Sequence, residues 1–68
     1  MRERYEYQPH HLLRQRVRDI PSGVEGTLMA VITENVSDTG IERWVDLAYI
    51  RNKSGREFST AVENIEPA

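Results

Sequence analysis

Two glycines three residues apart, Gly23 and Gly26, form the first spacing in this chain that could do chemistry. A Gly-x-x-Gly loop clamps a nucleic-acid backbone in domains where helices flank the loop and a basic residue lies inside it. Here strand-like residues follow, and the loop interior is Val24 and Glu25, whose carboxylate would repel a phosphate. No Gly-Lys-Ser/Thr sequence completes a nucleotide-binding loop. We therefore interpret Gly23 and Gly26 as structural turn residues, where glycine permits a positive φ.

Nothing in the sequence pairs a nucleophile with a base. The serines fall in predicted turns or at a strand edge, and the two histidines, His10 and His11, are adjacent near the N-terminus. Neighbouring side chains of an extended segment point to opposite faces, and no third ligand follows at a metal-site spacing. Cysteine is absent, which excludes disulfides and cysteine-based zinc sites. We predict a protein that is not an enzyme and that uses no metal and no cofactor.

Arginine is concentrated at one end of an acidic chain. Residues 1–18 carry a net charge of +3, and residues 19–68 carry −5. Arginines interleaved with aromatic residues suit nucleic-acid contact. The candidate nucleic-acid-binding residues are therefore Arg2, Arg4, Tyr5, Tyr7, Arg14, Arg16 and Arg18. The acidic remainder argues against tight nonspecific binding, which depends on phosphate neutralisation, and a solvated mixed-charge surface is the alternative. The preference for arginine over lysine is also typical of GC-rich bacterial or phage genomes.

The elements that must position these side chains are short strands. Branched and aromatic residues between turn clusters predict strands over residues 15–19, 26–36, 41–52 and 56–62. The tail, residues 63–67, is predicted to make a helical turn or a short fifth strand. Residues 1–11 lack a sustained period and are predicted to be an N-terminal arm, so the folded domain covers residues 12–68. The fold class is all-β, a small antiparallel barrel of four to five strands.

Two details of the strand pattern bear on the core and on binding. Strict alternation fails in residues 26–36, and a bulge near Met29 would turn Leu28 and Val31 inward together. In the next strand Trp44 and Tyr49 have opposite parity and therefore lie on opposite faces. An exposed tryptophan is a common anchor for a protein partner, so Trp44 and Tyr49 are the candidate protein-binding residues. Alternatively, Trp44 closes one end of the barrel.

The layout resembles the small SH3-like barrels, and among them the KOW-type modules of bacterial transcription and translation proteins. The matching pieces are the strand QRVRDI, the turn PSGVEG, the apolar strand TLMAVI and the closing segment FSTAVENIEP. The resemblance covers residues 14–67 and implies that Leu28 and Val31 enter the core. It also implies RNA or ribonucleoprotein partners. KOW-type modules with such partners are usually basic, whereas this barrel segment is acidic.

Two functions remain open at this point. The first is a non-enzymatic module for protein–protein interaction or assembly, with a protein partner or self-association through Trp44, Tyr49 and a sheet edge. The second is a nucleic-acid or ribonucleoprotein-associated module that uses the arginines. The chain has no apolar run of membrane-spanning length and no secretory signal, so the prediction is a cytoplasmic protein without membrane contact.

Overall fold

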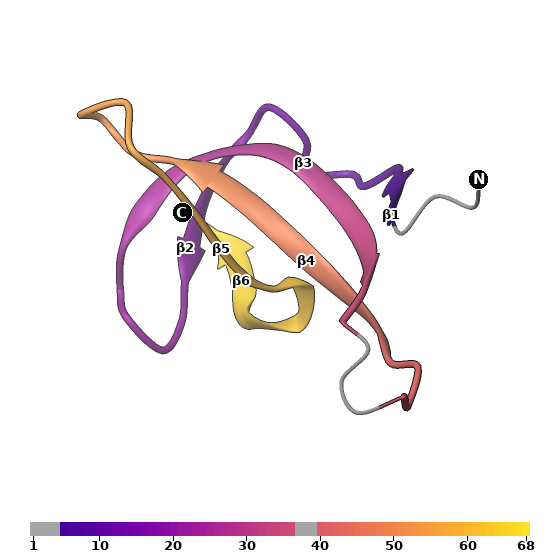
Figure 1. Cartoon of the computed structure of the whole chain (residues 1–68). Coiled ribbons are helices and arrows are strands. Elements are labelled where there is room, and N and C mark those ends of the chain that lie inside the picture. The colour runs from indigo at the N-terminus through magenta and orange to yellow at the C-terminus, as the bar shows by residue number, and fades with distance from the viewer. Residues whose placement is uncertain (1–4, 37–39) are drawn as a thin grey trace.

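The long strand β3 (Glu25–Asn35) is the centre of an all-β, antiparallel sheet in the computed structural model, which describes residues 5–36 and 40–68. Along one edge β3 pairs with β4 (Trp44–Arg51). Two strands share its other edge: β2 (Arg16–Asp19) pairs with the beginning of β3 and β1 (Tyr5–Gln8) with its end. Figure 1 shows the strongly curved β3 with β2 near its beginning and β1 near its end. The predicted all-β antiparallel fold is confirmed.

The remaining elements bring the chain back to β2. Strand β5 (Glu57–Ala61) pairs with β4, the 3-10 turn η1 (Val62–Asn64) follows, and β6 (Ile65–Pro67) pairs with β2. The tail thus forms both of its predicted alternatives, a helical turn and a strand. The order β5-β4-β3-β2-β6 curls into a barrel-like shape whose end strands, β5 and β6, are not ladder neighbours. The described residues form six strands rather than four or five because part of the predicted arm, residues 5–8, is β1.

The predicted bulge is present and shapes the core. Leu28 pairs with Ile50 and Ala30 with Tyr49, so the register shifts by one residue at Met29. Both Leu28 and Val31 are consequently buried. The core consists of Val17, Leu28, Val31, Ala48 and Ile50, with Leu12, Leu13, Phe58, Val62 and Ile65 packed against it. A bulge lets one strand turn two residues of unlike parity toward the same core, which strict alternation forbids.

The Asp19 side chain connects β2 to the end strand β5. It is 6% exposed, and its carboxylate accepts hydrogen bonds from the hydroxyl and backbone N–H of Ser22 and from Thr60 Oγ1 at 2.8 Å. Thr60 lies on β5, 41 residues further along the chain. The hydroxyl bonds of Ser22 and Thr60 lower the pKa of Asp19 because they stabilise the carboxylate. Side chains therefore connect β2 to β5 where backbone ladders do not.

The two glycines of the first turn have different structural roles. Gly23 has a φ of +75°, and its N–H donates to the Asp19 carbonyl at 2.7 Å, as expected of a turn residue. Gly26 is instead a buried residue of β3 opposite Val17, which corrects its assignment to the turn. A Cβ on Gly26 would meet the Arg51 carbonyl oxygen and lie 2.7 Å from Ile50 Cγ2. Glycine is needed at position 26 because β4 approaches too closely for a side chain.

The hairpin of β3 and β4 extends well past the core. The molecule measures 37 × 21 × 21 Å, and in Figure 1 the end of β3 and the beginning of β4 lie away from β2 and β6. Strand β5 pairs with β4 only as far as Leu47, and on the outer half of β3 only β1 lies along the other edge among the described residues. The outer half of the hairpin therefore has fewer neighbouring strands than the inner half among the described residues. Within residues 5–36 and 40–68 no helix is long and apolar enough to cross a membrane.

Candidate binding surfaces

Tyr49 and Trp44 lie on opposite faces of β4 and line different clefts, as their parity predicts. The Tyr49 ring is partly buried, and its hydroxyl donates a hydrogen bond to Glu34 Oε1 at 2.9 Å. Burial, and then this bond to the Glu34 carboxylate, raise the pKa of Tyr49 because both disfavour the phenolate. The structure therefore does not bring Trp44 and Tyr49 into one site.

Tyr49 belongs to a surface that we call the tyrosine face. The strand register places Tyr7 beside Ile32, and Ala30 beside Tyr49, on the side of the sheet that faces away from the core. The face is formed by Tyr5, Tyr7, Met29, Ala30, Ile32, Glu34, Tyr49 and Glu57, which line a shallow cleft of about 490 Å³. Tyr5 is 49% exposed and Tyr7 is 67% exposed. Their rings meet edge to face with centroids 6.0 Å apart.

The charged groups lining the tyrosine face are carboxylates. Glu34 accepts from Tyr49, and Glu57 accepts from Arg51 Nη2 at 2.7 Å. Sequence reasoning grouped Tyr5 and Tyr7 with the nucleic-acid candidates, whereas in the structure these rings adjoin Tyr49 and Glu34. The alternation of Tyr5 and Tyr7 was visible in the sequence, but the docking of β1 on β3 that places them beside Tyr49 was not. The arginines Arg2 and Arg4 lie outside the described residues.

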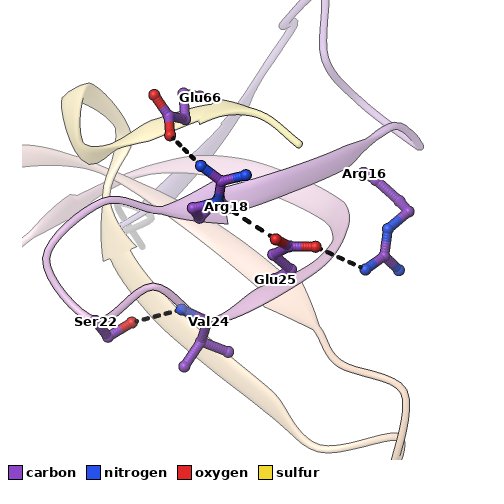
Figure 2. A network of polar contacts seen from close by, with 6 residues as sticks. All are labelled: Arg16, Arg18, Ser22, Val24, Glu25 and Glu66. Atoms are coloured by element: carbon purple, nitrogen blue, oxygen red, sulfur yellow. Dashed lines mark hydrogen bonds and ion pairs between the residues drawn. The ribbon is translucent and has the colours of Figure 1, made fainter.

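The arginines of β2 are engaged with carboxylates of neighbouring strands (Figure 2). Arg16 Nη2 lies 3.2 Å from Glu25 Oε1, and Arg18 Nε lies 3.3 Å from Glu25 Oε2. Arg18 Nη1 also reaches Glu66 on β6 at 2.9 Å. These bonds lower the pKa of Glu25, Arg16 contributing most. Arg14 stands apart from this network, in the loop before β2, with a φ of 69°. The three candidate arginines therefore do not form an open basic stripe.

Trp44 lies at the far end of β4. It shares the parity of the core residues Ala48 and Ile50, but it pairs with Asn35 near the hairpin tip and is 47% exposed. The alternative in which Trp44 closes the barrel is therefore wrong. Trp44 lines a second cleft, of about 570 Å³. The residues that line this cleft are Val36, Arg43, Trp44, Val45, Asp46, Leu47, Ala61 and Glu63. We call this cleft the Trp44 notch.

The part of the chain that the structure describes contains no group of three or more His, Cys, Asp or Glu side chains placed to hold a metal ion. His10 and His11 stack on each other with ring centroids 4.7 Å apart, and His10 Nδ1 accepts from the Leu12 N–H. The His10 ring thus organises the loop between β1 and β2. No protein-family model, curated protein or solved structure matches the chain.

Proposed function

We propose that this chain is a small, non-enzymatic protein-binding module whose tyrosine face holds an extended segment of a partner protein. The observation that carries the proposal is the gathering of Tyr5, Tyr7 and Tyr49 around one accessible cleft on the bare side of the sheet. Tyrosine supplies a large contact area with few rotatable bonds and a polar tip, which is why it is enriched among the residues that dominate binding energy.

The charge of the face favours a protein partner over a nucleic acid. A phosphate brought onto the tyrosine rings would approach the Glu34 carboxylate, and like charges repel, whereas Glu57 is already paired with Arg51. An extended protein segment with apolar side chains and one basic residue fits better, since the rings take the apolar groups and a carboxylate faces the cation. The partner is accordingly a segment of that composition.

The closing part of the chain supports the proposal that the barrel is SH3-like. The 3-10 turn η1 precedes β6, which returns to pair with β2, the strand that opens the predicted domain. The KOW-like nucleic-acid function receives less support because Arg16 and Arg18 are matched by Glu25 and Glu66. A phosphate that contacted either arginine would approach these carboxylates, and like charges repel.

Selection of peptides from a random display library, followed by affinity measurement on single variants, tests the proposal. Tyr7→Ser is expected to weaken the selected peptides at least about tenfold, because hot-spot aromatic residues contribute 2 kcal/mol or more. The matched control is Ile20→Ser, which removes an exposed apolar side chain from the turn that follows β2, outside the tyrosine face. Equal loss of affinity in the two variants, or none in Tyr7→Ser, would refute the proposal.

An oligo-dT strand and an oligo-U strand provide the second arm of the experiment. At low salt neither is expected to bind measurably. Salt-sensitive binding that Arg16→Ala reduces, without an effect of Tyr7→Ser, would instead assign the chain to the nucleic-acid class.

A further inference from the structure

We propose a second binding site at the Trp44 notch, which takes an extended protein segment carrying a basic side chain as an added strand on the edge of β4. This site is distinct from the tyrosine face because it lies at the edge and on the core-facing side of β4. It does not depend on the function proposed above.

The notch exists because β5 leaves the sheet before β4 ends. Pairing between the two strands stops at Leu47 and Ala61, after which the chain turns into η1. Strand β4 continues to Trp44 and remains paired with β3 on its other side. No described strand pairs with the edge of β4 at Trp44, Val45 and Asp46. An extended segment placed there would continue the line of β5 and bond to the backbone groups of this edge, as in strand addition.

The side chains around this edge supply an apolar anchor point. The Trp44 indole, 47% exposed, lines the notch together with Leu47 and Ala61, and Val36 contributes a further exposed apolar side chain. An indole face attracts a cation as well as apolar groups, because its π-electrons carry partial negative charge. The notch therefore offers backbone hydrogen-bonding groups, an apolar surface and an aromatic face together.

Charge decides which side chain the segment carries. Asp46 and Glu63 line the notch, against Arg43. The register also aligns Glu6 of β1, through Thr33 of β3, with Asp46, so that two carboxylates stand on one row across the sheet. Asp46 accepts a hydrogen bond from Thr33 Oγ1, which fixes its position. A lysine or arginine beside Trp44 would face Asp46 and Glu63, whereas an acidic side chain or a phosphate would be repelled.

The chain's single tryptophan makes the test direct, because its fluorescence reports this site alone. The probe is a capped peptide of alternating valine and arginine, Val-Arg-Val-Arg-Val. A saturable change in Trp44 emission is expected, with a Kd no weaker than about 1 mM. Asp46→Asn and Glu63→Gln are each expected to weaken binding by about two- to fivefold, the range of exposed ion pairs. Glu57→Gln, which removes a carboxylate from the tyrosine face, is the matched control and should leave the Kd unchanged.

Two further peptides separate strand addition from simple charge attraction. Val-Glu-Val-Glu-Val should not bind, because its carboxylates meet Asp46 and Glu63. A version of the arginine peptide with proline in place of the central valine should bind several-fold more weakly, because proline removes a backbone donor. The proposal is overturned if the arginine peptide gives no saturable change in Trp44 emission. It is also overturned if the glutamate peptide binds as tightly as the arginine peptide, or if Glu57→Gln weakens binding as much as Asp46→Asn and Glu63→Gln do. Unchanged binding of the arginine peptide to Tyr7→Ser would show that the notch works independently of the tyrosine face.

Discussion

Replacing Gly26 by alanine is the sharpest test of how the barrel is packed. The new Cβ would meet the carbonyl oxygen of Arg51 and lie 2.9 Å from its carbonyl carbon, which are backbone atoms of the neighbouring strand. It would also lie 2.7 Å from Ile50 Cγ2, a side-chain atom of the core. None of these atoms can swing away as the end of a flexible side chain can. Strand β4 would have to separate from β3 at this point.

The expected cost follows from this geometry. Overpacking a core costs about 1–3 kcal/mol, and contact with backbone atoms places Gly26→Ala at the upper end, about 3 kcal/mol. A domain of this length is stable by about 3–10 kcal/mol, so the variant loses a large part of its stability. Gly23→Ala serves as the control. No atom lies within 4 Å of a Cβ there, and the cost is the left-handed backbone conformation alone, about 1 kcal/mol. Gly23→Asn should cost less than Gly23→Ala, because asparagine tolerates that conformation.

Urea unfolding followed by far-UV circular dichroism measures all three variants. The midpoint for Gly26→Ala should fall well below those of Gly23→Ala and Gly23→Asn, with similar slopes that justify comparing free energies of unfolding. The reasoning fails if Gly26→Ala costs no more than Gly23→Ala. In that case Gly26 would be a turn residue after all, and the close approach of β4 would be unimportant.

Two predictions concern titrating groups. Because the pKa of Asp19 is lower in the folded chain, its ionised form stabilises the fold above the ordinary aspartate value of about 3.9, and this contribution is lost as the pH falls below it. Below about pH 4, the free energy of unfolding of Asp19→Asn should therefore depend less steeply on pH than that of the wild-type chain. Parallel curves for the variant and the wild type would contradict the role of Asp19. Because the pKa of Tyr49 is raised, ultraviolet titration should show a tyrosine ionisation step above the ordinary tyrosine value of about 10. Tyr49→Phe should remove that late step, and its persistence would place the perturbed group elsewhere.

Local pattern was enough to predict most of the barrel. The break in alternation at Met29 correctly indicated a bulge, and strand parity correctly separated Trp44 from Tyr49. Both depend on near neighbours in the chain. The predicted strand of residues 26–36 correctly included Gly26, but the need for glycine there was wrongly assigned to the turn, because it comes from β4, about 25 residues away.

The candidate sites were harder to predict because they depend on pairing between distant strands. Arg18 meets Glu66, 48 residues away, so a stripe that reads as basic in the sequence is neutralised in the fold. Tyr5 and Tyr7 alternate as strand residues do, yet nothing local indicates that they dock on the end of β3 next to Tyr49. Composition identified the aromatic residues, and topology determined which of them share a surface.

The division of one edge of β3 between β2 and β1 has a consequence for dynamics. β2 is held by β6, by Asp19 and by the core residue Val17, whereas β1 contributes no side chain to the core cluster. The pairing of β1 can open while the barrel stays folded, so amide hydrogens that bond β1 to β3 should exchange faster than those between β3 and β4. The tyrosine face exists only while β1 is docked. If the proposed partner uses that face, it binds the form of the protein in which β1 is docked and shifts the population toward that form.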